Sequence, residues 1–183
     1  MHRMIILILI ILFTCSACGF GKKPEHKKRA DRIMKKVAHK LQREKHLILM
    51  GIGDIMDDIK KITIGFQFYG EKSINEAREL LVDAVESYLT TINEKKEFRP
   101  YLHNYPFTPK NIHIIIYFST MNGHAVPAGE ITIVSSNQGR ITYLIHNPEA
   151  PTLHEYYEES FEEARHIYYS SLSNKHSYTN SPH

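Results

Sequence analysis

The sequence predicts an α+β fold of two layers, in which helices cover one face of a mostly antiparallel, four-stranded sheet. Three stretches support this prediction. Residues 62–69 alternate apolar and polar side chains, the period of two that is typical of a strand with one buried face. Residues 112–119 are almost continuously apolar, as in a strand at the centre of a sheet. Residues 74–92 carry apolar side chains three and four positions apart, which predicts an amphipathic helix.

The first predicted helix covers residues 27–45. Apolar residues recur along it at the spacing of one helix face, and lysines and arginines occupy the opposite face. The apolar positions are Ala30, Ile33, Met34, Val37, Ala38 and Leu41. The next stretch, residues 47–58, contains Gly51 and Gly53, so we expect a bend there, or a short strand followed by a turn.

The second helix has a clear start signal. Ser73 and Glu76 match a capping box, in which each side chain bonds the backbone of the other residue. The apolar stripe that follows predicts a helix ending within residues 94–97. Three prolines in residues 98–111 then exclude regular structure, so this segment is expected to be a loop.

The C-terminal part predicts two more strands and a third helix. Residues 130–135 and 140–146 read as strands joined by a hairpin connection. Thr152 to Glu155 match a second capping box, so we expect a helix from there to residue 172. Its apolar stripe consists of Leu153, Tyr157, Phe161, Ala164, Tyr168 and Leu172.

The resulting element order is α-β-α-β-β-β-α. The last three strands should form an antiparallel meander, and the first strand should join them through a helical crossover, which is right-handed if the joined strands are parallel. The chain of 183 residues divides into a signal peptide (1–17), a lipidated anchor and linker (18–26), a single α+β domain (27–172) and a frayed tail (173–183).

The N-terminus has the pattern of a secretory signal. Arg3 precedes nine apolar residues, 5–13, and small residues follow them. Crossing a bilayer takes roughly 20 apolar residues, so this run is too short for a transmembrane anchor. Cys15 and Cys18 are the two cysteines of the chain. A domain that starts at residue 27 therefore has no disulfide, no thiolate metal site and no cysteine nucleophile.

The motif Ser16-Ala17-Cys18 resembles the lipobox of bacterial lipoprotein precursors, although Cys15 stands where that family usually has Leu. The resemblance implies cleavage before Cys18, a diacylglycerol on its sulfur, and two or three acyl chains in the mature protein, enough for stable membrane attachment. Gly19 rather than Asp follows the cysteine, which favours the outer membrane where two membranes exist. Ordinary secretion and a retained anchor remain the alternatives.

Charge is distributed very unevenly along the chain. Residues 22–46 hold eleven lysines and arginines and three acidic residues, a net charge of +8, whereas residues 47–183 have a net charge of −6. A basic helix close to a lipid anchor is expected to touch anionic headgroups, to which each cation contributes up to about 1 kcal/mol. The alternative is a solvated basic helix face. Nucleic-acid binding is disfavoured because the predicted signal exports the chain.

The proline-rich loop is the preferred binding site predicted from sequence. Arg99 can present a cation among aromatic and polar side chains, and loops on a rigid scaffold often carry binding. The candidate residues are Arg99, Tyr101, His103, Asn104 and Tyr105. The alternative is a structural loop that packs its aromatic side chains on the sheet or helix ends. The run from Phe98 to Ile112 is also similar to uncharacterised small lipoproteins of chlamydia-like bacteria, a family without an assigned activity.

A weaker alternative is a metal site on the third helix. Glu158, Glu162 and His166 are four residues apart and would share one face of it. Another acidic group, Asp54, Asp57 and Asp58, fits a solvated turn better than a cation site and lacks the spacing of an EF-hand. The sequence contains no phosphate-binding loop, no dinucleotide-binding motif and no serine nucleophile elbow, and no cofactor is expected.

Together these features predict a lipid-anchored protein of the cell envelope with a binding or scaffolding role and no catalysis. The alternative is an envelope enzyme or metal-binding protein that uses His and Glu side chains of the third helix or of residues 98–111. That alternative requires His103, His113 or His146 to approach Glu162 or His166. A third possibility is an effector or immunity-like interaction protein released without a lipid, which the chemistry of the mature N-terminus would reveal.

Overall fold

The computed structural model describes residues 24–53, 58–147 and 153–179. The predicted signal peptide 1–17 and the predicted lipidation site Cys18 lie outside these residues, and so do Asp54, Asp57 and Thr152.

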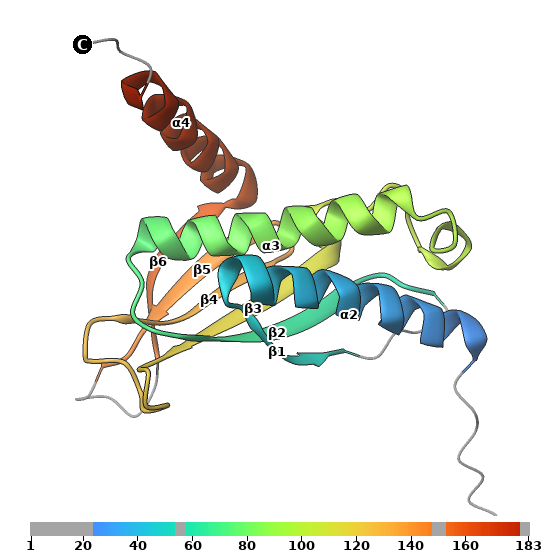
Figure 1. The fold of residues 1–183 in the computed structure, drawn as a ribbon. Helices are drawn as coiled ribbons and strands as arrows, with labels where there is room; N and C mark the ends of the chain where they lie inside the picture. The colour runs from blue at the N-terminus through green and yellow to red at the C-terminus, as the bar shows by residue number, and fades with distance from the viewer. Residues whose placement is uncertain (1–23, 54–57, 148–152, 180–183) are drawn as a thin grey trace, which may run out of the picture.

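The described chain combines three helices with one six-stranded mixed sheet (Figure 1). The helices are α2 (Glu25–Lys45), α3 (Ile74–Glu94) and α4 (Phe161–Thr179). The strands are β1 (Ile48–Ile52), β2 (Ile62–Tyr69), β3 (Ile112–Ser119), β4 (Ile131–Asn137), β5 (Arg140–Ile145) and β6 (His154–Ser160). The helices predicted at residues 27–45 and 74–92 and the four predicted strands are therefore present, and the mixed α+β class is confirmed.

The predicted four-stranded, mostly antiparallel sheet is wrong in size and in type. Six strands pair in chain order, β1-β2-β3-β4-β5-β6. β2 and β3 run parallel in register from the pair Ile62 and Ile112 to the pair Tyr69 and Ser119, while the other neighbours are antiparallel. α3 connects the two parallel strands, which is the helical crossover that the sequence predicted. β3, β4 and β5 form the expected meander.

β1 lies outside the four predicted strands, and it corresponds to the short strand that was one of the two alternatives for residues 47–58. Its pairing with β2 shifts register between Leu49 and Gly51, a β-bulge that interrupts the alternation. Beyond the strand, the Gly53 N–H donates to the Thr63 carbonyl at 2.8 Å. A Cβ on Gly53 would lie 3.2 Å from the Thr63 Cβ, so this glycine permits a close backbone approach. Gly51 thus lies in an edge strand, and Gly53 follows directly after that strand.

β6 is the second strand outside the four predicted ones, and it corrects the predicted third helix. Residues 154–160 pair with β5, and the helix begins only at Phe161. The capping box that starts it is formed by Ser160 and Glu163. The Glu163 N–H donates to Ser160 Oγ at 3.2 Å, and the Ser160 N–H donates to a Glu163 carboxylate oxygen at 2.9 Å. α4 extends to Thr179, beyond the predicted helix end at residue 172.

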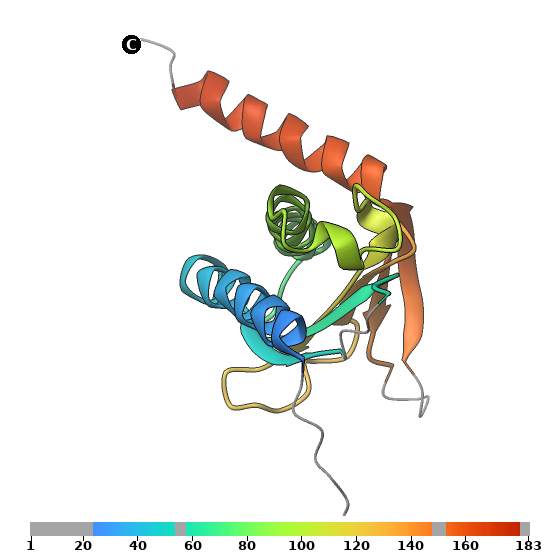
Figure 2. The same cartoon turned by 90° about the vertical axis from the view of Figure 1, so that its right-hand side faces the viewer.

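All three helices lie on one face of the sheet (Figures 1 and 2). The buried core lies between the two layers, and alternate residues of β3 point into it. These are Ile112, Ile114, Ile116 and Phe118. Among the described residues, no helix combines the length and the apolar composition needed to cross a membrane.

Two ion-pair clusters tie the helices to α3. The Lys45 ammonium of α2 lies 3.3 Å from Glu79 and 2.5 Å from Asp83. Partial burial of Lys45 opposes its charge, but the two carboxylates outweigh this and raise its pKa. Further along α3, Glu86 accepts hydrogen bonds from Arg165 at 2.7 Å and from the Tyr169 hydroxyl. α3 is therefore the central helix of the layer.

A buried ion pair connects α3 to the far edge of the sheet. Arg78 Nε donates to Glu159 Oε1 at 2.8 Å, and the side chains are 7% and 2% exposed. The Tyr143 hydroxyl donates to the same oxygen at 2.5 Å, and burial followed by this bond raises its pKa well above the usual range. Asn75 accepts a further bond from Arg78. The network joins α3, β5 and β6 inside the core.

Replacement of the cap residue tests the corrected start of α4. We expect Ser160→Ala to lower the free energy of unfolding by about 1 kcal/mol, because the Glu163 N–H loses its acceptor. Ser170→Ala, at an exposed position inside the same helix, is the matched control and should change it little. Urea unfolding with circular dichroism measures both variants, and equal effects would contradict the assigned helix start.

The same variant has an expected pH dependence. The hydrogen bonds from the side chain and backbone of Ser160 lower the pKa of Glu163 below its ordinary value of 4.5. A carboxyl group whose pKa is lower in the folded state stabilises the fold at pH values above its unfolded-state pKa. This stabilisation is lost as the pH falls through the folded-state pKa. The stability difference between wild type and Ser160→Ala should therefore shrink as the pH drops below 4.5.

Removing one partner of the buried Arg78–Glu159 pair should lower the free energy of unfolding far more than removing one partner of an exposed ion pair. Glu159→Ala leaves the Arg78 charge buried, and we expect a loss of about 3–5 kcal/mol in the free energy of unfolding. Glu158→Ala on the same strand breaks a pair with the exposed Arg140 and should have a small effect. Chemical denaturation measures the free energy of unfolding of both variants. Similar losses in the two would show that the buried network is not a major source of stability.

Candidate functional site

Helix α2 presents its positive charge to solvent. Its inner face buries an apolar stripe in the core, and its outer face is exposed. The exposed cations are Lys28, Arg29, Arg32, Lys35, Lys36, Lys40 and Arg43. The helix starts immediately after Pro24, the first described residue, so this basic face lies where the predicted anchor segment joins the domain.

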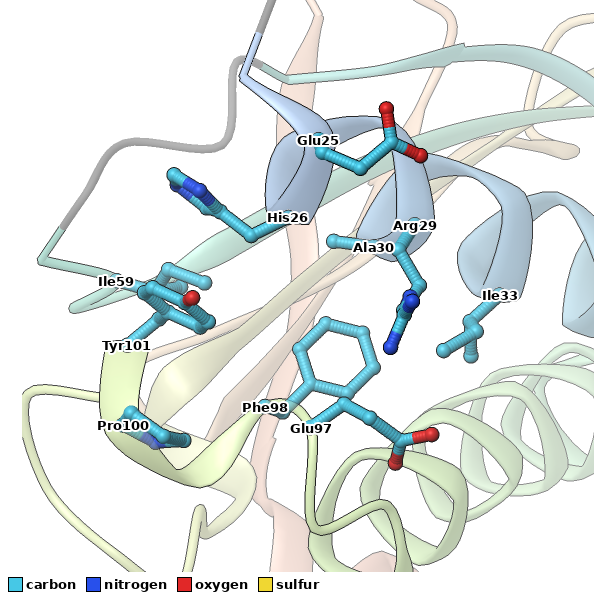
Figure 3. A pocket seen from close by; sticks show the side chains of 10 residues that line it. All are labelled: Glu25, His26, Arg29, Ala30, Ile33, Ile59, Glu97, Phe98, Pro100 and Tyr101. Atoms are coloured by element: carbon cyan, nitrogen blue, oxygen red, sulfur yellow. The ribbon is translucent and has the colours of Figure 1, made fainter.

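A cavity of about 390 Å³ lies between the first turns of α2 and the loop after α3 (Figure 3). Most of its wall is apolar, and the cavity falls within the range of about 300–1,000 Å³ that is usual for ligand pockets. The lining residues come from α2, from the segment before β2 and from the loop. They are Glu25, His26, Arg29, Ala30, Ile33, Ile59, Glu97, Phe98, Pro100 and Tyr101.

Tyr101 is held firmly at one side of this cavity. Its carbonyl accepts from the Ile59 N–H at 2.7 Å, and its N–H donates to the Phe98 carbonyl at 2.9 Å. Its ring stacks on the imidazole of His26 at a centroid distance of 4.3 Å and an interplanar angle of 9°. Ile59 and Phe98, the backbone partners of Tyr101, are themselves buried, so the position of the Tyr101 ring is fixed. The stacked rings of His26 and Tyr101 form one wall of the cavity.

Three charged side chains border the cavity, and they point in different directions. Figure 3 shows the side chain of Arg29 running from α2 toward the ring of Phe98. The carboxylates of Glu25 and Glu97 point away from the space between Phe98 and Tyr101. The charge that reaches the apolar wall is therefore positive.

The other predicted loop residues lie outside this cavity. The guanidinium of Arg99 lies over the ring of Tyr105, 4.7 Å from its centroid. His103 Nδ1 lies 2.9 Å from a carboxylate oxygen of Asp58, and Asn104 is exposed. Of the five residues predicted as a binding surface, the structure brings Tyr101 to the cavity and pairs Arg99 with Tyr105, while His103 turns to the segment before β2.

Much of the loop has a structural role. Asn93 at the end of α3 accepts from the Phe107 N–H at 2.8 Å and donates to the Phe107 carbonyl at 2.9 Å. Phe98, Leu102 and Phe107 are buried in the core, as the structural interpretation of the loop expected for the last two. The buried side chains of Phe98, Leu102 and Phe107 therefore anchor the loop at three points. Tyr101 lies between the first two and projects from a backbone that is held in place.

Several residues of the cavity were not singled out from the sequence. Ile33 belongs to the apolar stripe that was recognised, and Phe98 is an aromatic residue of the loop. His26 and Arg29 gave no signal, because nothing local distinguishes them from the other basic residues of α2. Their position opposite Tyr101 depends on packing between segments more than seventy residues apart.

The predicted metal site assumed that Glu158, Glu162 and His166 lie on one face of a single helix, and this is not the case. Glu158 lies in β6 and not on α4, and it pairs with Arg140 through two contacts of 2.5 and 2.6 Å. Glu162 and His166 do line a shallow hollow with Glu158. Among the described residues, however, no three His, Cys, Asp or Glu side chains gather closely enough to hold a metal ion. His103, His113 and His146 thus form no metal-binding cluster with these residues.

Removal of the Asn93 side chain tests whether the loop is clamped as described. Asn93→Ala breaks two partly buried hydrogen bonds to Phe107, and we expect a loss of about 1–3 kcal/mol in the free energy of unfolding. Asn104→Ala in the same region changes an exposed side chain and should stay within about 0.5 kcal/mol of wild type. Urea titration measures both, and an equal response would show that the clamp contributes no stability.

Comparisons of the chain with protein families, with curated proteins and with solved structures returned no match.

Proposed function

We propose that this protein is a lipid-anchored component of the bacterial cell envelope with a binding or scaffolding role and no catalysis. In this proposal Cys18 carries the lipid, and the outer face of α2 lies against anionic headgroups. The observation that supports it best is the exposed basic face of α2, a helix that begins at Glu25, seven residues after Cys18. An extended segment of seven residues reaches at most roughly 25 Å, so a lipid on Cys18 keeps α2 near the membrane.

The charges of α2 suit such a surface. Arg32, Lys35, Lys36 and Arg43 form no ion pair with the described residues, whereas Lys28 pairs with Glu25, Lys40 pairs with Glu44, and Lys45 at the inner end of the helix is neutralised by α3. Each free cation near an anionic surface contributes about 1 kcal/mol. Several together supply a second attachment beside the lipid, which is the arrangement that stable peripheral binding requires.

The rest of the domain has the opposite charge and is available to partners. Residues 47–183 have a net charge of −6, and acidic side chains are frequent on α3, β6 and the start of α4. A membrane with an anionic surface repels this part and attracts α2, which orients the domain. The acidic surface then faces away from the headgroups, where we propose that it meets a protein partner.

Charge reversal on α2 tests the headgroup contact. The double variant Arg32→Glu with Lys36→Glu should lower the affinity for phosphatidylglycerol vesicles at least about tenfold, since two charges reverse and the net charge of the contact surface changes by about four units. Lys60→Glu with Lys61→Glu makes the same change at exposed positions outside α2 and is the matched control. Vesicle co-sedimentation of the full chain carrying Cys18→Ser measures the contact without the lipid.

Two outcomes would contradict the proposal. Equal losses in the two double variants would show that α2 is not the contact surface, and binding to phosphatidylcholine vesicles as strong as to phosphatidylglycerol would exclude a headgroup charge effect. Mass spectrometry of the mature N-terminus tests the anchor separately. A diacylglyceryl group on Cys18 is expected, and an unmodified terminus at another residue would remove the anchor from the proposal.

A further inference from the structure

The cavity between α2 and the loop after α3 has an apolar lining, which plays no part in the proposed contact with headgroups. Ala30, Ile33, Ile59, Phe98 and Pro100 give it an apolar wall. The exposed cations further along α2 face solvent instead. A space lined in this way favours an apolar group withdrawn from water over an ion or a sugar.

Arg29 is the polar group that distinguishes this cavity. Three other arginines of the domain each hold a carboxylate: Arg78 pairs with Glu159, Arg140 with Glu158 and Arg165 with Glu86. Arg29 has no carboxylate within ion-pair distance among the described residues, and its side chain runs along the apolar wall. A guanidinium in this position is suited to an anionic group that enters with an apolar ligand.

We propose that the cavity binds a single-chain amphiphile with one anionic head group, the chain against Ala30, Ile33 and Phe98 and the head group on Arg29. Fatty acids and lysophospholipids share this chemistry. A volume of about 390 Å³ lies at the small end of the usual range, which favours one chain over two. The inference goes beyond membrane attachment, because the residues that it assigns to the ligand all lie in the described part of the chain, apart from the predicted lipid on Cys18.

The neighbouring side chains define the direction of entry. The His26–Tyr101 stack closes one side, and the backbone bonds of Tyr101 hold that side in place. Arg29 borders the opposite part of the wall, beside Phe98. The chain of the amphiphile therefore lies between the stacked rings and Phe98, and its head group remains at the basic surface of α2, where anions accumulate.

Calorimetric titration with four probes of equal chain length tests the ligand class. The probes are decanoate, decyl phosphate, decanol and decyltrimethylammonium, each below its micelle concentration and each added to the full chain. Both anions should bind more tightly than the neutral and cationic probes. A preference for decanoate identifies the fatty-acid class, and a preference for decyl phosphate identifies the lysophospholipid class. Equal binding of decanol and both anions, or no binding at all, overturns the proposal.

Paired variants locate the head group. Arg29→Gln should weaken decanoate or decyl phosphate binding about tenfold or more and leave decanol binding within about twofold, because hydrogen bonds to a charged group are lost. Arg32→Gln removes the same charge one turn further along α2 and does not line the cavity, so it should have little effect. Both variants keep the leader, and binding to the leader therefore cancels in the comparison. Equal effects of the two substitutions overturn the assignment to Arg29.

Filling the cavity locates the chain. Ile33 is half-buried on the cavity wall, so Ile33→Trp places an indole in the space and should abolish binding of the anionic probes, with folding checked by circular dichroism. Retained binding in a folded Ile33→Trp variant overturns the proposed position. If the protein does not bind vesicles but Arg29→Gln still weakens binding of the anionic probes selectively, only the proposed headgroup contact is refuted. If the protein binds vesicles but Arg29→Gln has no selective effect, only the proposed cavity site is refuted.

Discussion

Burial of the sheet on a single face is the constraint on which the rest of the structure depends. β3 shows it most clearly, since every second residue from Ile112 to Phe118 is buried and the residues between them are only partly covered. α2 and α3 must both turn their apolar stripes toward the same face. As a result the basic residues of α2 point outward, and its first turns extend to the loop at Phe98, where the two segments enclose a cavity instead of closing completely.

Within this one-sided core, the Arg78–Glu159 pair supplies a polar contact of defined geometry. Apolar packing specifies the register of β6 only weakly, because most of its side chains are polar or exposed. Glu159 lies opposite Ile141 in the β5–β6 register, and it meets Arg78 and Tyr143 at once. A shift of β6 would leave a charge buried without a partner. The pair thus fixes the point from which α4 starts.

The sequence was informative where a local pattern decides the structure. The alternation of residues 62–69 and the capping box at Ser73 both correspond to elements of the fold, because their periodicity reflects the side on which the core lies. The start of α4 was misplaced, because Leu153, Tyr157 and Phe161 have helical spacing although the chain pairs as a strand up to Ser160. The cavity is not encoded locally at all. Tertiary packing alone brings the beginning of α2 against the loop after α3.

Chain-ordered strands also determine where the two ends of the domain lie. Because β1 and β6 occupy opposite edges, five interstrand spacings separate them, a width of about 24 Å. α2 covers the first edge and α4 rises from the last, so the sheet acts as a rigid spacer between the N-terminal and the C-terminal helix (Figure 1). The exposed Ile167 and Tyr169 of α4 therefore lie at the opposite edge of the domain from α2 and its basic face.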